Sequence, residues 1–384
     1  MRIPANYFAI AETCNRLHRG VVLIVLSRKY VIDYIKDGGK RVAMTLKTST
    51  LQDVARVAKV STATVSRTLS NPDVVSESTR RRVSEAVKVT GYRINRAARN
   101  LRTQRAHSVL VLLPDLANPF FSTILEGISR SLSKQGYSML IASTKQVHDS
   151  GERLIDYLDD ARADGMIILD GGLEPEVVEL LANAPQARRI LFACEWVDGT
   201  GFPSVRCENS QGTRKAVNHL YDLGHRKIAH VTGPEGNVLM HARKDAFVAE
   251  IALLGLTLKP EWIIPGDFSL AAGCLAAKAW IAMEDRPTAV FCASDQLAMG
   301  FIAELSRHGF QVPKDVSVMG FDDIDLAEQF IPPLTSIKQD RLMIGETAAK
   351  MLMARIETPP EEHLQHAAVL PVSLVIREST AAPQ

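Results

Sequence analysis

Apolar residues at helical spacing dominate the stretch 50–91. A first helix is predicted to start after Thr50, because Asp53, three residues later, completes a variant of the capping box. The periodic apolar positions that would form the buried faces are Leu51, Val54, Ala55, Ala58, Val65 and Leu69. A further helix is predicted to begin at Ser76 and to end at Gly91, a residue type that accepts left-handed backbone.

Between these two helices, the pattern predicts a turn at 59–61 and a second helix over 62–69, stopped at 71–72 by Asn-Pro. Small polar residues at its N-terminal end would allow this helix to enter a DNA major groove without steric clash. Arg67 can donate two hydrogen bonds to a guanine edge or reach a phosphate. The candidate residues for DNA contact on this helix are Thr62, Ala63, Thr64, Ser66 and Arg67. The alternative is a three-helix bundle with a solvated polar face.

From Ser108 onward, short apolar runs alternate with helical segments. The predicted strands are 109–113, 138–142, 166–169, 190–193, 228–231, 289–293 and 316–320, and the predicted helices are 120–135, 151–163, 209–223, 242–254, 271–283 and 295–308. This alternation predicts parallel sheets with helices on both faces. Two such units in tandem, divided near 203–207, predict two lobes with a cleft between them. The predicted fold is therefore an α-helical helix-turn-helix headpiece followed by a two-lobed α/β core with parallel sheets.

Charge is distributed unevenly along the chain. Residues 45–105 hold 13 lysines and arginines against 4 acidic residues, a net charge of +9, and residues 1–44 add +5. Because the whole chain carries only +2, residues 106–384 must carry −12. A basic head on an acidic body favours a partner with phosphate groups, and it excludes a uniformly basic protein.

Composition narrows the class of protein further. The chain of 384 residues is long enough for more than one domain. The five cysteines, which show no C-x-x-C spacing, are Cys14, Cys194, Cys207, Cys274 and Cys292. They indicate neither a zinc site nor a disulfide framework, and a reducing cytoplasm fits them. No G-x-S-x-G, H-E-x-x-H, P-loop or G-x-G-x-x-G motif occurs, so we expect no enzyme, no cofactor and no metal.

The first 44 residues do not belong to the head pattern. The apolar run 21–26 is far shorter than the roughly 18 residues needed to span a bilayer. Arg16 and Arg19 precede it as in a weak signal peptide, yet no A-x-A-like cleavage site follows. We expect that translation begins at Met44 and that the upstream stretch is a start-site artefact. The alternative is a genuine, partly disordered arm, and an intact mass would distinguish the two.

Five motifs occur in order along the head: T-L-Q-D-V-A from Thr50, V-S-T-A-T-V-S-R from Val60, V-S-E-S-T-R, G-Y, and N-R-A-A-R-N-L from Asn95. In this combination, the head resembles the headpiece of the lactose/galactose repressor (LacI/GalR) family of bacterial regulators. The resemblance implies base contacts at Thr62, Ala63 and Arg67, and a hinge helix over 96–101 that orders on DNA. Its candidate DNA contacts are Asn95, Arg96, Arg99 and Leu101, the last as a wedge in the minor groove. The implied domains are 45–93, a hinge and linker over 94–106, and a core over 107–384.

The body resembles periplasmic sugar-binding proteins, as do the bodies of this family. In such sheets, ligands bind beyond the carboxyl ends of the strands. The candidate effector-binding residues are Asn118, Phe120, Phe121, Glu195, His241, Arg243, Phe268 and Asp295. By the resemblance, Asp295 is the effector-binding aspartate, with a helix cap as the alternative, and Arg243 is the cleft arginine, although Ala246 stands where the family usually has glycine. Phe268 is expected to stack on a ligand ring, or else to be a core residue.

The candidate effector-binding residues, together with the string G-F-D-D-I-D-L from Gly320, look most like those of the cytidine-responsive branch of the family. A nucleoside effector is therefore favoured over a pentose or hexose. We expect a cytoplasmic, nucleoid-associated repressor that binds operator DNA as a homodimer, because no heptad tail follows 375–380. A periplasmic-type binding protein that does not bind DNA is the weaker alternative, since it leaves the basic head unexplained. Whether the effector releases or promotes DNA binding stays open.

Overall fold

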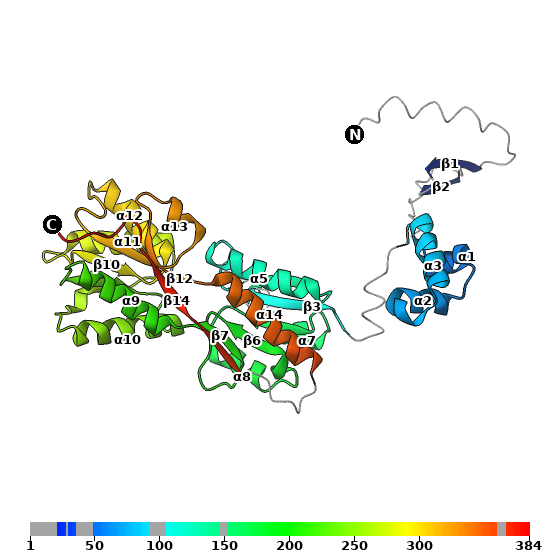
Figure 1. Ribbon diagram of the computed structural model, residues 1–384, viewed down its shortest axis with the longest axis horizontal. Helices are drawn as coiled ribbons and strands as arrows, with labels where there is room; N and C mark the ends of the chain where they lie inside the picture. The colour runs from blue at the N-terminus through cyan, green and yellow to red at the C-terminus, as the bar shows by residue number, and fades with distance from the viewer. Residues whose placement is uncertain are drawn as a thin grey trace, which may run out of the picture. The chain divides into compact units, whose positions relative to one another are not determined.

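The computed structural model describes residues 21–27, 30–35, 49–92, 105–145, 147, 153–358 and 366–384. The chain divides into two compact units, Met1–Arg102 and Thr103–Gln384, which are described separately below (Figure 1). In the first unit, β1 (Val21–Ser27) pairs antiparallel with β2 (Tyr30–Ile35).

The other described residues of the first unit, 49–92, form the predicted three-helix head. Its elements are α1 (Leu51–Ala58), α2 (Thr62–Ser70), the short 3-10 helix η2 (Pro72–Val74) and α3 (Glu77–Thr90). The predicted capping box is confirmed, since Thr50 and Asp53 each bond the other's backbone N–H through their side chains. Ser76 precedes α3, and Gly91 follows it with a left-handed φ of 65°. The helices enclose a small core made of Val54, Ala55, Ala58, Val65, Val83 and Ala86.

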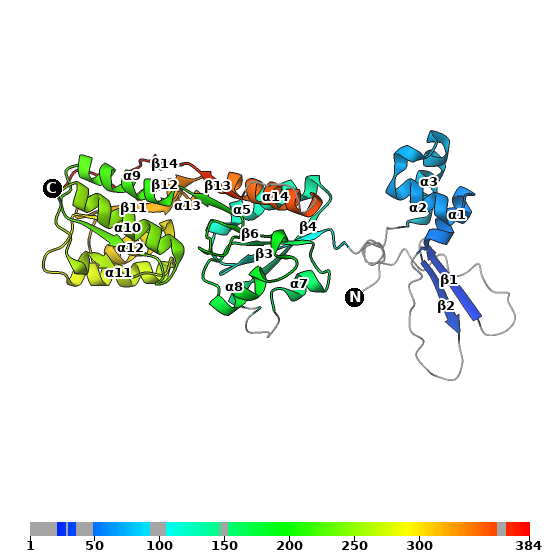
Figure 2. The same cartoon turned by 90° about the horizontal axis from the view of Figure 1, so that it is seen from below.

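The second unit contains two lobes, each built on a six-stranded sheet. The N-terminal lobe has the all-parallel order β13-β7-β6-β5-β3-β4. Its strands are β3 (Ser108–Leu113), β4 (Ser138–Ser143), β5 (Gly165–Ile168), β6 (Ile190–Ala193), β7 (Ser204–Cys207) and β13 (Ala367–Leu370). Its helices are α5 (Phe120–Lys134), α7 (Asp156–Asp159), α8 (Pro175–Ala182), η3 (Ala187–Arg189) and α14 (Arg341–Glu357). Figure 2 shows α5 and α14 on one face of this sheet, and α7 and α8 on the other.

The C-terminal lobe has the order β14-β12-β11-β10-β8-β9, parallel except for the antiparallel β12–β14 pair. Its strands are β8 (Ile228–Val231), β9 (Ile263–Ile264), β10 (Ala289–Cys292), β11 (Ser317–Asp322), β12 (Thr335–Gln339) and β14 (Val372–Val375). Its helices are α9 (Asn209–Asp222), α10 (Val238–Leu253), η4 (Pro260–Trp262), α11 (Leu270–Ala282), α12 (Asp295–Arg307) and α13 (Asp325–Gln329). Figure 1 shows α9 and α10 on one side of this sheet and α11 and α12 on the other.

The chain first passes from the N-terminal to the C-terminal lobe at about Glu208, next to the predicted division near 203–207, but the lobes are not two simple tandem halves. The chain leaves the N-terminal lobe after β7, returns to it with α14 and β13, and leaves it again for β14. Three connecting segments therefore join the lobes, at about Glu208, Asp340 and Pro371. Such multiple connections favour a hinge, because they permit rotation of one lobe against the other while preventing separation.

Two predicted helices differ from those in the structure. The sequence predicts a helix over 151–163. Of the described residues in this range, 153–163, only the four residues of α7 are helical, so the prediction is wrong for the others. Helix α10 begins four residues earlier than expected, because the Asn237 side chain caps it by accepting from the N–H groups of Leu239 and Met240. Pattern reading also missed α14, the longest helix in the described part of the chain.

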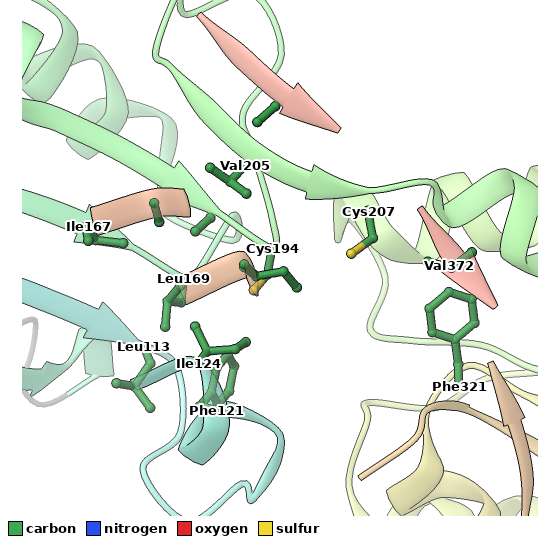
Figure 3. Packing of buried hydrophobic residues seen from close by; sticks show 14 of the residues in the cluster. Leu113, Phe121, Ile124, Ile167, Leu169, Cys194, Val205, Cys207, Phe321 and Val372 are labelled. Atoms are coloured by element: carbon green, nitrogen blue, oxygen red, sulfur yellow. The ribbon is translucent and has the colours of Figure 1, made fainter. Parts of the chain in front are cut away.

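One apolar cluster runs through the junction of the lobes. It includes Leu113, Phe121 and Cys194 in the N-terminal lobe and Phe321 in the C-terminal lobe. Figure 3 shows Phe321 of β11 near Val372 and Cys207, which lie beside the points where the chain passes between the sheets. The hinge region is therefore packed like a protein interior, so relative motion of the lobes has to slide or rotate this packing.

Candidate DNA-binding surface and effector cleft

Helix α2 is held by its buried side and presents its other side to solvent. Val65 is fully buried, whereas Thr62, Ala63 and Arg67 are exposed. Thr64 and Ser66 are half-buried. Ser61 caps the helix by accepting from the Thr64 N–H, with 3.1 Å between the two atoms. The exposed N-terminal end of a capped helix is the part that a helix-turn-helix protein inserts into the major groove.

An arginine of α3 fixes the turn that precedes α2. The Nη2 atom of Arg82 donates to the carbonyl oxygens of Ala58 (2.6 Å) and Lys59 (2.9 Å), which end α1. Lys59 itself has a left-handed φ of 50°. Sequence reasoning missed the role of Arg82, because this contact joins positions more than 20 residues apart and leaves no local pattern.

The predicted hinge contacts Asn95, Arg96, Arg99 and Leu101 lie outside the described residues. Their roles stay predictions.

In the core, polar side chains gather where strands of the two sheets end. In the N-terminal lobe, Glu195 follows β6 and is only 7% exposed. Its Oε2 atom accepts from the Gly171 N–H (2.6 Å) and from Nδ2 of Asn237 (3.0 Å), a residue of the C-terminal lobe. Burial raises the pKa of Glu195 to about 7, while these two hydrogen bonds oppose the increase. Glu195 therefore links the lobes through a carboxyl group that changes protonation near neutral pH.

The loop beside Glu195 depends on a glycine. A Cβ atom at Gly171 would lie 3.0 Å from the Glu195 Cβ and 3.1 Å from its Oε2. The preceding residue, Asp170, accepts from the Thr144 hydroxyl at 2.6 Å, so the ends of β4 and β5 are joined as well. Neither Asp170 nor Thr144 was among the sequence candidates.

In the C-terminal lobe, a buried arginine occupies the centre of the polar group. Arg243 on α10 is 2% exposed, and its Nε donates to Oδ1 of Asn209 at 3.0 Å. Its Nη1 donates to the Ala293 carbonyl and lies 4.0 Å from Oδ1 of Asp322. The guanidinium carbon stands 3.8 Å from the centre of the Phe321 ring and 5.9 Å from that of Phe268. The planar cation is thus enclosed by an aromatic face, an amide and a carboxylate.

Asp322, at the end of β11, is 6% exposed and accepts from Nε2 of Gln339 at 2.7 Å. Burial raises its pKa to about 6, and the nearby Arg243 opposes this. Its φ of 119° turns the chain sharply at the strand end, so that its carboxylate stands beside Arg243. Sequence reasoning missed Asp322 as a site residue, although its place after a buried strand in G-F-D-D was a usable signal.

Asp295 lies deep in the C-terminal lobe, after β10 and at the start of α12. It is fully buried, and its carboxylate accepts from the Ile324 N–H (2.8 Å) and the Ser336 hydroxyl (2.6 Å). Gly320 is required beside it, since a Cβ there would come within 2.2 Å of Oδ1. Burial raises the pKa of Asp295 well above its ordinary value, and Asp322 adds to the increase. Asp295 thus joins the start of α12 to β12 and to the turn after β11, and Ser294 rather than Asp295 caps α12. Its role in effector binding stays a prediction.

Phe268 lies beside the buried arginine, and its predicted stacking on a ligand ring stays a prediction. It is half-buried with a φ of 67°, and its ring fills the space above Gly233, where a Cβ would meet it at 2.2 Å. A flat, partly open ring next to a guanidinium can stack on a planar ligand.

The remaining candidates lie around this group with different exposures. Phe121 is buried in the core of the N-terminal lobe and Phe120 is half-buried, packing against the cores of both lobes. Asn118 is half-buried and accepts from the Phe120 N–H at 2.9 Å, which forms the turn into α5. His241 is exposed on α10.

A cavity of about 390 Å³ opens beside Gln339, which is also the hydrogen-bond partner of Asp322. Thr123 of the N-terminal lobe and Ile324 of the C-terminal lobe both line it. Its charged lining residues are Asp323, Asp325, Glu328, Lys338, Asp340, Arg341 and Arg377. The junction of the lobes therefore contains polar space that a small molecule could reach.

Within the described residues, no group of three or more His, Cys, Asp or Glu side chains could hold a metal ion. Among the same residues, no helix is both long enough and apolar enough to cross a membrane.

Together, the capped recognition helix and the two-lobed core define a ligand-responsive DNA-binding regulator. Two family models match the chain: that of bacterial regulatory proteins of the lacI family, at residues 50–95, and that of periplasmic binding protein-like domains, at residues 217–380. The HTH-type transcriptional repressor CytR of Escherichia coli (strain K12) is 37% identical over 336 residues, covering 87% of this chain and 97% of the relative.

Two solved structures are also similar. One is the lac repressor dimer bound to operator and the anti-inducer ONPF, with 30% identity, a TM-score of 0.73 and coverage of 88% of this chain and 100% of that chain. The other is a LacI family transcriptional regulator from Enterococcus faecium with bound ribose, with 30% identity, a TM-score of 0.64 and coverage of 72% and 100%.

The chain therefore belongs to the LacI family of bacterial regulatory proteins. It is a DNA-binding transcriptional repressor with a small-molecule-binding core, and it belongs with regulators, not with enzymes.

Proposed function

We propose that the effector of this repressor is a nucleoside, bound between the lobes where Arg243, Asp322 and Phe268 meet. The observation that carries the proposal is the buried pair of Arg243 and Asp322, 4.0 Å apart, beside the half-open ring of Phe268. A charged pair buried this deeply costs desolvation free energy, so a functional reason for keeping it is a reasonable inference.

The chemistry of the three side chains matches the two halves of a nucleoside. A carboxylate accepts hydrogen bonds from ribose hydroxyls, and a guanidinium donates to ring and hydroxyl oxygens. The ring of Phe268 offers a face on which a planar base can stack. Resemblance to the cytidine-responsive branch, together with the identity to CytR, supports the same choice.

Glu195 and Asn237 would couple binding to closure of the lobes. Their 3.0 Å hydrogen bond joins the lobes directly, and the Glu195 carboxylate lies close enough to Arg243 for the two charges to interact. A ligand that contacts both groups would favour one arrangement of the lobes over the other, and this differential affinity is what shifts an equilibrium.

A pentose or hexose effector is the second candidate. The ribose-bound relative, 30% identical, supports it, because a free sugar would use the same carboxylate and guanidinium. Only the base half of the ligand, and hence stacking on Phe268, distinguishes the two candidates.

On the DNA side, we propose that Thr62, Ala63, Thr64, Ser66 and Arg67 contact operator bases or phosphates, and that Asn95, Arg96, Arg99 and Leu101 act in a hinge. We further propose the division into a head over 45–93, a hinge and linker over 94–106, and a core over 107–384. A homodimer reading a near-palindromic operator fits this arrangement, as in the lac repressor dimer bound to its operator. The repressor would act in the cytoplasm, where the chromosome lies, in association with the nucleoid.

A thermal-shift screen of the full chain tests the effector. Cytidine, adenosine, ribose and glucose are added singly to the wild type and to Asp322→Asn. Binding to the folded state stabilises it by about 2.7 kcal/mol when the ligand stands at a hundred times its dissociation constant. We expect a nucleoside to raise the melting temperature of the wild type and to have a much smaller effect on Asp322→Asn.

Stabilisation by ribose or glucose alone would support the sugar candidate and refute the nucleoside. A nucleoside shift of equal size in Asp322→Asn would place the ligand somewhere other than the proposed site. Glu328→Gln, which neutralises an exposed carboxylate of the adjoining cavity, serves as the matched control.

A further inference from the structure

One buried carboxylate lies where the chain enters the core from the linker. Asp164 is 5% exposed, and each of its oxygens accepts from one backbone N–H. Oδ1 accepts from the N–H of Ala106 at 2.8 Å, and Oδ2 from that of His107 at 2.9 Å. These N–H groups belong to the last residue of the linker and the first residue of the core. Two hydrogen bonds to one ionised group are strong, because each is assisted by charge.

The neighbouring backbone completes this attachment. The Asp164 N–H donates to the Ser108 carbonyl (2.8 Å), and the Ser108 hydroxyl donates to the Arg162 carbonyl (2.6 Å). From the other side, the Ser138 N–H donates to the His107 carbonyl at 2.9 Å. Residues 106–108 are therefore bound to the start of β5 and to the start of β4.

The backbone of His107 is held in an unfavourable conformation there. Its φ is 49°, in the left-handed region that non-glycine residues rarely adopt. Such a conformation persists only when surrounding contacts fix it. The Asp164 carboxylate supplies one of these contacts, and the edge-on packing of the His107 ring against Tyr137, with 5.4 Å between ring centres, supplies another.

The same short strand connects Asp164 to the proposed effector site. Asp164 immediately precedes β5 (Gly165–Ile168), and Asp170 and Gly171 follow at the other end. There the Gly171 N–H donates to Glu195, whose carboxylate joins the two lobes. A strand in the middle of a sheet is stiff, so a displacement of its carboxyl end is passed to its amino end.

We propose that Asp164 is a positioning residue, which clamps the end of the linker to β5 so that closure of the lobes is transmitted to the DNA-binding head. The clamp rests on the proposed function, since it needs an effector site at Glu195 and a head that binds DNA. Asp164 contacts neither DNA nor effector. Without it, residues 106 and 107 detach from the sheet, and the head binds DNA without being aligned by the core.

A purely structural role would make a different prediction. If Asp164 only stabilised the lobe, its replacement would lower the melting temperature and weaken all functions in proportion. A clamp instead predicts loss of specific operator affinity and of effector response, with nonspecific DNA binding and ligand binding by the core retained.

The experiment uses the full-length protein and a duplex that the wild type selects from a randomised library. Asp164→Ala removes both acceptors, and the nearly isosteric Asp164→Asn keeps one. Asp160→Asn is the matched control, since Asp160 lies in the same loop with an exposed side chain. The readouts are affinity for the selected duplex, affinity for a scrambled duplex, the thermal shift with cytidine as probe, and amide hydrogen exchange of residues 105–113.

We expect Asp164→Ala to lose about ten- to a hundredfold in affinity for the selected duplex, because hydrogen bonds to a charged group are of that strength. Asp164→Asn should lose less, and Asp160→Asn should match the wild type. Exchange should accelerate at residues 106 and 107 but not along the rest of β3, and the cytidine shift and scrambled-duplex affinity should stay unchanged.

Unchanged affinity for the selected duplex in both Asp164 variants would overturn the clamp while leaving the proposed function intact. Equal losses on selected and scrambled DNA, together with a lower melting temperature and a lost cytidine shift, would assign Asp164 a structural role only. A wild type that selects no duplex would instead contradict the proposed function, and the clamp with it.

Discussion

The head and the core place their functional groups in opposite environments. In the head, Thr62, Ala63 and Arg67 are exposed, and the residues that stabilise the fold, such as Val65, are different ones. In the core, Arg243, Asp322 and Glu195 are all more than nine-tenths buried. Glu195 joins the two lobes and Arg243 links elements within the C-terminal lobe, so the residues of the proposed effector site also stabilise the fold.

This difference determines how each region can respond to change. A surface that binds a preformed partner can be altered residue by residue with little effect on folding. A binding site made of buried residues cannot be altered in this way, because removing one buried charge leaves its partner charge uncompensated. Ligand binding in the core should therefore be coupled to its stability, whereas DNA binding by the head should not.

The largest expected effect is that of Arg243→Ala. Removing the guanidinium leaves the Asp322 carboxylate and the Asn209 amide without their buried partner. We expect the free energy of unfolding of the core to fall by about 3–5 kcal/mol, measured by urea denaturation. Lys244→Ala, at the adjacent half-buried position, should change it by less than about 1 kcal/mol. If both variants lowered the free energy of unfolding by a similarly small amount, the contrast between a site built into the core and a surface site on the head would not hold.

Asp322→Asn should act mainly on the ligand. The amide preserves the shape of the side chain but loses the charge, and we expect cytidine affinity to weaken by about 1.5–3 kcal/mol in calorimetric titrations. Asp295→Asn is the matched change at the other buried strand end, and it should weaken affinity less, because the Asp295 carboxylate already accepts from Ile324 and Ser336. The reverse order of effects would make Asp295 the principal ligand-binding residue.

The protonation of Glu195 predicts a pH dependence of core stability. Its pKa rises from an ordinary value of 4.5 to about 7 in the folded protein, so the folded state binds more protons than the unfolded state between these values. The free energy of unfolding should therefore fall as pH rises from 4.5 to 7, with a contribution on the order of 1–3 kcal/mol. Glu195→Gln should flatten this part of the profile relative to wild type, and identical slopes would contradict the assignment.

The smallest effect on stability is expected for Arg67→Ala in the head. Base preference at one operator position should relax by about 1–3 kcal/mol in a randomised operator library. The melting temperature of the head should hardly move, because the Arg67 side chain is exposed. A large loss of stability would show that function and folding are not separated in the head either.

The two regions also differ in how far the sequence predicts them. The head is contiguous, and its signals act over a few residues: Thr50 bonds Asp53, Ser61 bonds Thr64, and Gly91 ends α3. The predicted helices of the head therefore agree with those of the structure to within one residue.

In the core, the positions of most strands were predictable, because buried parallel strands are short apolar runs between turns. The site itself was only partly predictable. Arg243 reaches Asn209, 34 residues away, and Asp322 reaches Gln339, 17 residues away. Asp295 and Asp322 both lie at the ends of buried strands, and the sequence does not indicate that the Asp322 carboxylate is the one 4.0 Å from Arg243. Helix α14 was missed because its buried residues surround it, leaving little contrast between a polar and an apolar face.

The most direct test of the account is an operator titration of the full-length protein, with and without cytidine, in the wild type and in Asp322→Asn. Fluorescence anisotropy of a labelled, library-selected duplex supplies the affinity. The account predicts that cytidine changes the operator affinity of the wild type at least severalfold, in one direction, and that Asp322→Asn binds the operator but no longer responds. An equal cytidine response in Asp322→Asn, or a response of the wild type to ribose but not to cytidine, would contradict it.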